Sequence, residues 1–409
     1  MPEDHRKMLH RTVYICDWLP PDFGAVGQYS LQFARERAIG GQHVVLVGLS
    51  SRRESIERQP LGSGLLEVIR IRARTYDRSN FTTRLLWTIQ TNCRLLRHAW
   101  SQIKSADEIL FTGSPPFLLH FLAPLNLLLR KRLVYRITDF HPECLMAERQ
   151  HVPSWLRAIY KLTLFWRRRV HHFEVLGEDQ GRRLREIGIP RSRFELKRDP
   201  SPIRITPHTK PLPIPPELQG YVILLYSGNF GVAHDHETFL NGYRLHHQTG
   251  PGRVALWLNA VGTKADLVEQ SIRRLGLPIH RSRPVTLETL PRLLVTADAH
   301  LITLRDPFVG FVLPSKVYAC IQSGRDVLYV GSERSDIDLL CRESLAPSAY
   351  QRIPVGDLVG VARALEILAE RPTRAAAPHA CSSTGPTFSH LVHTSSNILQ
   401  THFDIGTPK

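Results

Sequence analysis

Apolar runs alternate with amphipathic stretches through most of this 409-residue chain. Near the start, the run "RTVYICDWL" (residues 11–19) predicts a buried strand. The run "HVVLVGL" (43–49) predicts a second one, because nearly all of its side chains are apolar. Between them, residues 26–41 place apolar side chains at helical spacing and end at two glycines. This strand–helix–strand order predicts an α/β fold with a doubly wound parallel sheet.

The alternation continues in two halves that a proline-rich stretch separates. Residues 197–220 contain seven prolines, which suits an extended linker. Further strands are expected at 108–113, 132–138, 171–177, 221–228, 253–262, 298–306 and 325–331. We therefore expect four parts: an N-terminal domain (1–198), a linker (199–218), a second α/β domain (219–371), and a loose Ala-, Ser-, Pro- and Thr-rich tail (372–409) with a possible final helix at 388–403.

Composition and charge narrow the class of protein. The formal net charge of +16 favours anionic partners, namely nucleotide phosphates, nucleic acid or an acidic membrane surface, although solubility alone would also explain it. The six cysteines are scattered without a Cys-x-x-Cys pair, so neither a zinc site nor a disulfide framework is predicted. The longest apolar run, residues 117–129, is too short to span a bilayer and predicts a buried helix. No signal peptide is visible, and we expect a cytoplasmic protein.

Two loops combine glycines with the start of a helix. In "DWLPPDFGAVGQYS", Gly24 and Gly27 would let a ligand approach the backbone near a helix N-terminus, but a structural turn explains them equally well. In "LYSGNFGVAHD", residues 227–231 are expected to leave the strand, and a helix is expected from Asp235. Backbone N–H groups in such a turn suit a diphosphate. A tight turn that serves packing alone is the alternative.

Several segments together resemble family 4 of the glycosyltransferases, over roughly residues 13–368. They are the "PPDFG" loop, "FTGSPPF", "YRITDFHPE", "YSGNFGVAHD" and "LPSKVYACIQSGRDVLYVG". The resemblance implies the GT-B fold, in which two Rossmann-like domains face each other across a cleft. It also implies a retaining, metal-independent transfer, without a cofactor, from a nucleotide-diphosphate sugar to a saccharide or lipid-linked acceptor. The implied nucleotide-sugar contacts are Gly24, Gly27, Gly228, Asn229, Gly231, Lys264, Asp306, Pro314, Ser315 and Lys316.

Two of these residues are lysines at expected helix starts. Lys264 follows a glycine and a threonine after an apolar strand, and Lys316 ends the "PSK" motif. A basic side chain at a helix N-terminus opposes the helix macrodipole, so its position asks for an explanation. A bound phosphate is one explanation, and a solvated surface lysine is the other.

The acidic loop "TDFHPE" supplies the candidates for catalysis. Asp139 follows a buried strand of the first domain, where a carboxylate can orient or deprotonate an acceptor hydroxyl. His141 is a second candidate, with a loop histidine that has no role as its alternative. Glu143 has the simpler explanation of starting the next helix.

One departure from the family concerns a Glu-x7-Glu pair, whose second member contacts the nucleotide ribose in many relatives. The two positions correspond here to Phe311 and Ala319, and neither is acidic. Asp306 is the nearest acidic residue that would replace the contact. No HExxH motif and no suitably placed Asp-x-Asp supports a metal.

A basic stretch, "SWLRAIYKLTLFWRRRVHH", carries an apolar stripe at helical spacing. Lys161 and Arg167 to Arg169 would let it lie against an anionic membrane that carries a lipid-linked acceptor. The pattern alone favours the other interpretation, a helix of the domain core with a solvated rim.

Three rival functions remain open on the sequence. A nucleotide-sugar epimerase would share the two-domain fold and cleft. The loss of the glutamate pair also allows a catalytically silent homologue. Charge alone suggests a nucleic-acid-binding protein, but no RNP, KH or helix-turn-helix signature is visible.

Overall fold

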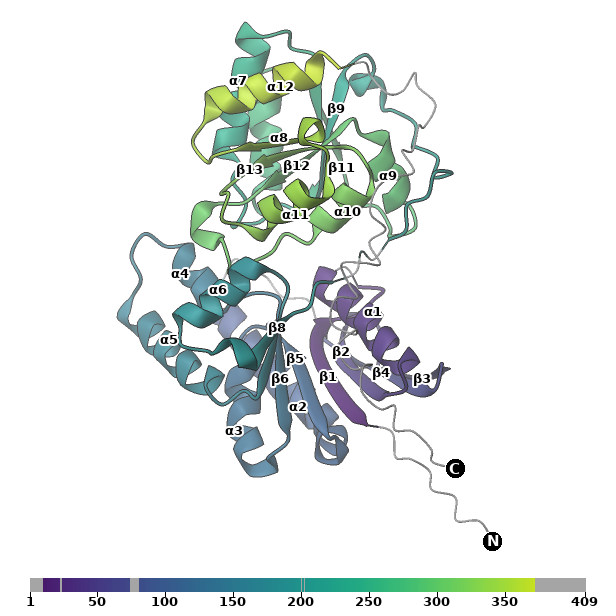
Figure 1. The fold of residues 1–409 in the computed structure, drawn as a ribbon, viewed down its shortest axis with the longest axis vertical. Helices are drawn as coiled ribbons and strands as arrows, with labels where there is room; N and C mark the ends of the chain where they lie inside the picture. Colours follow the sequence, from purple (N-terminus) through teal and green to yellow (C-terminus); the bar gives the residue numbers. More distant parts are fainter. Residues whose placement is uncertain (1–9, 23, 74–80, 200, 202, 372–409) are drawn as a thin grey trace, which may run out of the picture.

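The computed structural model describes residues 10–22, 24–73, 81–199, 201 and 203–371. The predicted final helix at 388–403 lies outside the described residues. The N-terminal half holds a sheet of β1 (Arg11–Trp18), β2 (His43–Ser50), β3 (Ser55–Leu61), β4 (Gly64–Arg72), β5 (Glu108–Thr112), β6 (Arg132–Ile137), β7 (His172–Val175) and β8 (Phe194–Leu196). Their order across the sheet is β3-β4-β2-β1-β5-β6-β7-β8 (Figure 1).

The C-terminal half holds a second sheet. Its strands are β9 (Val222–Asn229), β10 (Val254–Val261), β11 (Ile279–Ser282), β12 (Ala299–Thr303), β13 (Asp326–Val330) and β14 (Tyr350–Ile353). They follow the order β11-β10-β9-β12-β13-β14, and every pair is parallel. The predicted α/β fold with two parallel sheets is confirmed.

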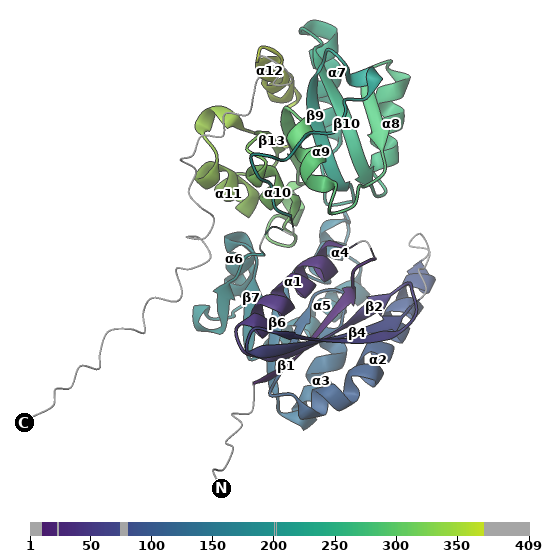
Figure 2. The same cartoon turned by 90° about the vertical axis from the view of Figure 1, so that its right-hand side faces the viewer.

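Helices cover both faces of the N-terminal sheet. Along β1, Val13 and Ile15 join the core under two helices, while Tyr14 and Cys16 join the core on the opposite face, as the period of two in a strand requires. Figure 2 shows α1 on one side of the sheet and α2 and α3 on the other. The helices of this half are α1 (Ala25–Ile39), α2 (Phe81–Ser105), α3 (Leu119–Leu129), α4 (Glu143–Ala147), α5 (Ser154–Arg167) and α6 (Glu178–Glu186), with the 3-10 turn η1 (Arg191–Arg193).

The C-terminal sheet is covered in the same way. Leu224 and Tyr226 of β9 face one core, and Ile223 and Leu225 face the other. The helices are α7 (Glu237–Thr249), α8 (Ala265–Arg274), α9 (Leu290–Thr296), α10 (Lys316–Gln322), α11 (Asp336–Ser344) and α12 (Leu358–Ala369), with the 3-10 turns η2 (Pro216–Leu218), η3 (Asp306–Phe308) and η4 (Pro347–Ala349).

The proline-rich stretch packs along the C-terminal half. Ile203 and Leu218 are buried in the core beneath β9 and β10, and Ile205, Leu212 and Ile214 pack against that core. The described residues between 201 and 215 contain neither helix nor strand. The stretch turns at residues 207–208, where the N–H of Thr209 donates to the carbonyl of Thr206, and its apolar side chains dock on the second sheet.

Two helices from different halves cap each other. The backbone N–H of Asp336, at the start of α11, donates to Asp179 Oδ2 of α6 at 3.0 Å. The N–H of Glu178, at the start of α6, donates to Asp336 Oδ1 at 2.9 Å. Arg198 pairs with the buried Asp336 carboxylate. Each carboxylate thus satisfies N–H groups that a helix start leaves unpaired, and the two halves are fixed together at this point.

Three sequence-based expectations need correction. The β3–β4 pair is antiparallel and was not predicted, because the exposed side chains of β3 break the apolar pattern. Residues 227–229 do not leave the strand, since Ser227, Gly228 and Asn229 still pair with β10. The helix within residues 117–129 is not wholly buried, because Leu128 at its end is 84% exposed.

Within the described parts of the chain, no helix combines the length and apolar character that crossing a bilayer requires.

A buried ion pair supports the loop after β6. Arg167 of α5 donates to Glu143 Oε2 of α4 at 2.9 Å and to the carbonyl oxygen of His141 at 3.1 Å. The two charged side chains are only 1% and 7% exposed. Arg167 therefore points into the protein, contrary to the expectation that it joins its neighbours on a basic surface.

Replacing Arg167 by Met should lower the free energy of unfolding by about 3–5 kcal/mol, because Glu143 would be left as an uncompensated buried charge. Calorimetry should show a fall in Tm on the order of 10 °C. Arg168→Met, one residue away and exposed, serves as the matched control and should change Tm little. A second change, Glu143→Leu, should restore much of the lost stability to Arg167→Met. Equal Tm values for the two single variants would contradict this assignment.

Candidate functional site

One segment of the C-terminal half, residues 308–316, lies against the N-terminal half. The N–H of Phe140 donates to the carbonyl of Phe311 at 2.9 Å. Asp139 and Val312 form an antiparallel bridge beside it. The hydroxyl of Tyr29, on α1, donates to the carbonyl of Ser315 at 3.4 Å. The segment therefore brings the predicted catalytic loop and the "PSK" motif together.

The ammonium group of Lys316 has an unusual environment at this junction. Its Nζ is shielded from solvent, has no hydrogen-bond partner among the described residues, and lies 3.2 Å from the centre of the Tyr226 ring. A methyl group added to Gly228 would lie 3.9 Å from the same nitrogen. Burial lowers the pKa of Lys316 to about 7. An anionic partner would therefore stabilise the buried ammonium strongly.

The end of β9 shapes the space next to this lysine. Gly228 has φ +124°, which favours glycine, and Asn229 is exposed. The N–H of Phe230 is already used, since it donates to the carbonyl of Val261 at 2.6 Å. Phe230 therefore cannot offer its N–H to a phosphate as the glycine turn suggested. The Tyr226 and Phe230 rings stack at 4.2 Å beneath the turn.

The remaining residues predicted to contact the donor in this half are spread along its edge. The N–H of Lys264 donates to the carbonyl of Phe230 at 3.0 Å, which ties the start of α8 to the glycine turn. Gly231 lies under the Asn229 side chain. Pro314 is half-buried in the segment that leads to Lys316, whereas Asp306 lies in the exposed turn η3 at the other end of that segment. Lys264 and Gly231 thus adjoin the glycine turn, whereas Asp306 lies in η3, two residues before the segment that leads to Lys316.

Asp139 has a carboxylate neighbour that the sequence analysis missed. Burial and the negative charge of Asp17 raise the pKa of Asp139 to about 6. Asp17 is the penultimate residue of β1 and accepts a hydrogen bond from the hydroxyl of Ser114, which follows β5. Asp17, Ser114 and Asp139 lie at or just beyond the carboxyl ends of the neighbouring parallel strands β1, β5 and β6, where α/β proteins bind ligands. A polar residue at the end of an apolar strand was the available signal for Asp17.

His141 is held as a neutral side chain. Burial lowers its pKa to about 4, so it carries no charge at neutral pH. Its ring lies 6.2 Å from that of Phe117, and its Nδ1 is buried without a hydrogen-bond partner in the described structure. The backbone carbonyl of His141 accepts from Arg167. These contacts give His141 a part in shaping the loop that carries Asp139.

The two glycines of the first loop differ in their surroundings. A Cβ on Gly27 would lie 1.8 Å from the carbonyl oxygen of Trp18, so α1 can approach β1 only because residue 27 lacks a side chain. A Cβ on Gly24 would have ordinary contacts, the nearest at 3.6 Å. Gly27 therefore has a sufficient structural explanation, whereas Gly24 leaves room at the helix start.

The two positions of the missing glutamate pair have apolar roles. Phe311 packs on the ring of Phe140 at 6.1 Å, and the guanidinium of Arg183 lies 4.8 Å from the centre of the Phe311 ring. Ala319 is buried in the core under β9 and β10. Neither position can hydrogen-bond a ribose through its side chain.

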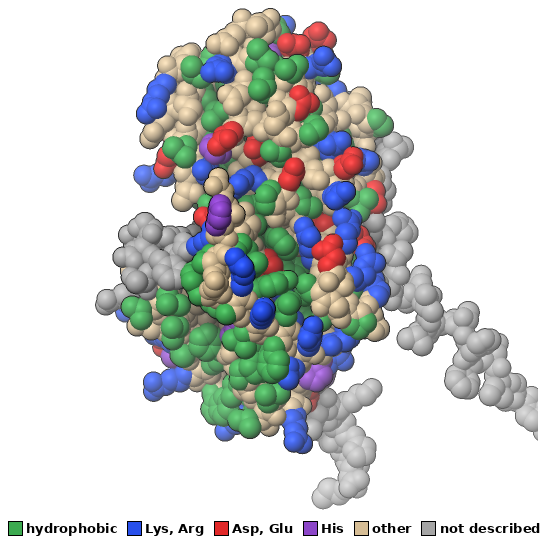
Figure 3. All heavy atoms as spheres, turned by 90° about the vertical axis from the view of Figure 1, so that its left-hand side faces the viewer, with side chains coloured by type: hydrophobic (Ala, Val, Ile, Leu, Met, Phe, Trp, Pro, Cys, Tyr) green, Lys and Arg blue, Asp and Glu red, His purple; other side chains and the backbone are tan. Residues whose placement is uncertain are grey.

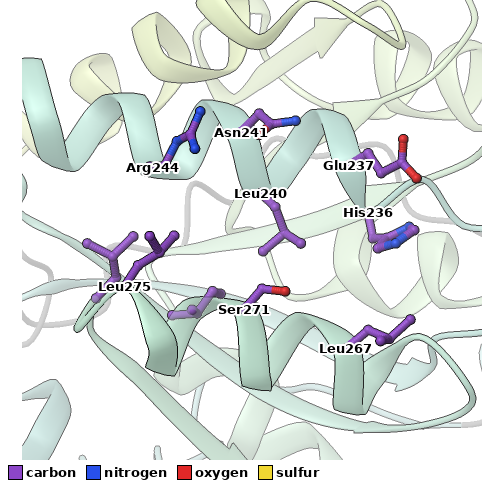
Figure 4. Close-up of a pocket in the computed structure, with 10 residues that line it drawn as sticks. His236, Glu237, Leu240, Asn241, Arg244, Leu267, Ser271 and Leu275 are labelled. Carbon is purple, nitrogen blue, oxygen red and sulfur yellow. The ribbon is translucent and has the colours of Figure 1, made fainter.

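A groove on the C-terminal half lies between α7 and α8 (Figure 4). Leu240 and Ser271 face each other across it, and His236 and Glu237 lie at one end. Its lining contains none of the residues predicted to contact a nucleotide sugar. The groove is therefore separate from the junction around Lys316. Across the described residues, no three His, Cys, Asp or Glu side chains are placed to share a metal ion.

Comparison with known proteins rests on structure. No family model and no curated sequence matches the chain. HepE from Anabaena in complex with UDP and glucose aligns with a TM-score of 0.58 and 10% identity, over 88% of this chain and 90% of that one. WaaG, a glycosyltransferase involved in lipopolysaccharide biosynthesis, aligns with 0.57 and 14%, over 88% and 90%. A UDP-forming α,α-trehalose-phosphate synthase from Burkholderia vietnamiensis aligns with 0.57 and 12%, over 89% and 92%.

These alignments cover both halves of the chain and agree with its two parallel sheets. The low identities restrict the conclusion to architecture. The chain has the GT-B glycosyltransferase fold.

The two glycines of the first loop give a matched test. Gly27→Ala should lower the free energy of unfolding by about 1–3 kcal/mol, because α1 must move away from β1. Gly24→Ala should leave Tm nearly unchanged, since its added methyl group meets ordinary contacts. Calorimetry on both variants decides between them, and equal losses would show that the approach of α1 to Trp18 does not depend on Gly27.

Proposed function

We propose that this protein is a glycosyltransferase that moves a sugar from a nucleotide-diphosphate sugar to a saccharide or lipid-linked acceptor. The C-terminal domain, 219–371, would hold the donor, and the N-terminal domain, 1–198, would present the acceptor. The fold supports this, because HepE, which shares it, binds UDP and glucose. The resemblance of the sequence motifs to family 4 supports retention of configuration and transfer without a metal ion.

The observation that carries the proposal is the ammonium of Lys316. A buried cation without a hydrogen-bond partner among the described residues is costly unless a ligand compensates it. A diphosphate beside Gly228 would supply that compensation, because phosphate oxygens accept charge-assisted hydrogen bonds from ammonium groups. Lys264 and the backbone at Gly231 are the further donor contacts that we propose. Asp306, in the exposed turn η3, stays the residue that we propose for the ribose contact in place of the missing glutamate.

On the acceptor side we propose that Asp139 receives the hydrogen bond or the proton of the acceptor hydroxyl. Its raised pKa, about 6, leaves the carboxylate ionised at neutral pH while making it a better base than a solvated aspartate. Burial is the main cause of the raised pKa of Asp139, and Asp17 would act as a positioning residue because its charge raises that pKa further. If the acceptor is lipid-linked, the protein works at the inner membrane face.

Lys316→Met should weaken UDP binding by about 1.5–3 kcal/mol, roughly 10- to 150-fold, because a charge-assisted contact is lost. Isothermal titration calorimetry measures this, and Lys210→Met, which removes an exposed lysine of the linker, is the control. Thermal-shift screening of UDP, GDP and ADP, and of their sugars, selects the nucleotide beforehand. Unchanged affinity in a folded Lys316→Met protein would remove the donor site from this position.

Binding should also depend on pH in a defined direction. Above pH 7 the free protein holds Lys316 partly unprotonated, whereas the nucleotide complex keeps it protonated, so binding takes up a proton. Affinity should therefore fall between pH 7 and 9, where the nucleotide phosphate is already fully ionised. Titrations in two buffers of different ionisation enthalpy should reveal the uptake. Lys316→Met should show neither effect, and proton uptake that persists in it would assign the proton to another group.

Asp139→Asn should reduce transfer by roughly 100- to 10,000-fold, since the amide cannot accept a proton. Tm and nucleotide affinity, measured on the same preparation, should hardly change.

Turnover of the unmodified protein should fall as pH drops through about 6, when Asp139 becomes protonated. Asp17→Asn removes the neighbouring charge and should shift this acid limb to lower pH. An acid limb that stays in place would separate Asp17 from Asp139, and near-normal turnover of Asp139→Asn would show that Asp139 is not catalytic. Nucleotide binding without any transfer in the unmodified protein would support a catalytically silent homologue.

A further inference from the structure

The inner face of helix α5 contacts the candidate catalytic loop. Its buried Arg167 binds both the Glu143 carboxylate and the carbonyl of His141. The Arg167 guanidinium also lies 4.9 Å from the centre of the Phe140 ring. The position of α5 and the position of the loop that carries Asp139 are therefore mechanically linked.

The outer face of α5 combines apolar and cationic side chains. Trp155, Leu162 and Phe165 are 44%, 45% and 43% exposed, although the sequence pattern favoured burial of Trp155 and Leu162 in the core. Residues 154–169 contain no Asp or Glu. The exposed cations of this stretch, which with the three apolar residues we call the α5 outer face, are Arg157, Lys161, Arg168 and Arg169.

The neighbouring helix extends this surface. His120 of α3 contacts the hydroxyl of Thr163 on α5 at 2.9 Å, so the two helices pack side by side. Leu127 and Leu128 near the end of α3 are 54% and 84% exposed. Figure 3, which views the side where α4 and α5 lie in Figure 1, shows hydrophobic side chains interspersed with Lys and Arg over the N-terminal half. Such exposed apolar groups mark an interaction surface rather than a solvated one.

We propose that the α5 outer face binds the surface of an anionic phospholipid bilayer. Trp, Leu and Phe on a helix face insert at the boundary between headgroups and acyl chains, and Lys and Arg beside them bind anionic headgroups. The guanidinium of Arg169 lies 3.4 Å from the centre of the Phe165 ring, which keeps one cation directly over an exposed aromatic side chain. A helix without acidic residues has no local repulsion from such a surface.

The consequence for the acceptor rests on the proposed function. A bilayer that touches the outer face of α5 lies one helix thickness, about 10 Å, from the loop that the inner face holds. An acceptor anchored in that bilayer would thus be presented to Asp139 across a short path. The surface therefore favours a lipid-linked acceptor over a soluble one.

Sedimentation with vesicles tests the bilayer contact without any nucleotide or acceptor, so its outcome is independent of the donor site. The full chain should co-sediment with vesicles that contain 30% phosphatidylglycerol, about 100-fold more strongly than with pure phosphatidylcholine, and 0.5 M salt should release it. The triple variant K161Q/R168Q/R169Q should lose roughly 100-fold in partitioning, because each cation contributes about fivefold. W155S/F165S should also bind more weakly.

The matched control removes the same charge from exposed arginines of three C-terminal helices, as R244Q/R274Q/R363Q. It should sediment like the unmodified chain. Equal recovery from both vesicle types would overturn the assignment. Equal losses in the two triple variants would also overturn it, because they would show that binding depends on the net charge of the protein and not on the α5 outer face. Unchanged sedimentation of W155S/F165S, together with salt-sensitive binding to RNA that K161Q/R168Q/R169Q loses, would overturn it in favour of a nucleic acid. Circular dichroism and Tm of every variant establish that each is folded.

Discussion

The candidate site depends on a short backbone contact between the two halves of the chain. The N–H of Phe140 binds the carbonyl of Phe311, and Asp139 pairs with Val312 beside it. A backbone hydrogen bond fixes which residues lie opposite each other as well as their distance. The position of Asp139 therefore sets the position of Val312, and Lys316 follows Val312 by four residues. The reciprocal caps of α6 and α11 hold the same two halves at a second point. The relative placement of the two halves thus rests on backbone groups at the first point and on two buried carboxylates that accept backbone N–H groups at the second.

The cost of burying Lys316 explains why this place is suited to an anion. Aliphatic and aromatic surroundings stabilise the stem of a lysine, but they do not replace the water that its ammonium loses. The Tyr226 ring offers a cation–π contact, worth about 2 kcal/mol when desolvated, which is less than a full hydration shell. Folding therefore leaves part of this cost unmet. The phosphate oxygens of the ligand that we propose would offset this cost, because they would accept charge-assisted hydrogen bonds from the ammonium.

Much of this architecture could be predicted from the sequence, because buried parallel strands leave long apolar runs that few other structures produce. The strands β1, β2, β5, β6 and β7 and those from β9 to β13, with β11 excepted, fall where those runs stand. Two of the misses depend on neighbours that are distant in sequence. Ser227 to Asn229 continue a strand only because β10 pairs with them, and Asp17 matters only because Asp139 lies next to it. The short β8, β11 and β14 carry too few residues for a pattern.

The run Arg167–Arg169 shows that identical neighbouring side chains can have different roles, which the sequence alone does not separate. Three identical side chains stand in a row, and the period of the helix turns the first toward Glu143 and the other two toward solvent. The inward one is a structural cation whose charge is neutralised, and the outward ones add to an uncompensated surface potential. One helix therefore uses arginine in two ways: its inner face pairs with a buried carboxylate, whereas no acidic side chain of the described residues forms an ion pair with its outer face. A surface of that kind needs negative charge from outside the chain, and so does Lys316 at the junction. The nucleotide diphosphate and the anionic bilayer that we propose would supply this negative charge, one at the junction and the other at the outer face of α5.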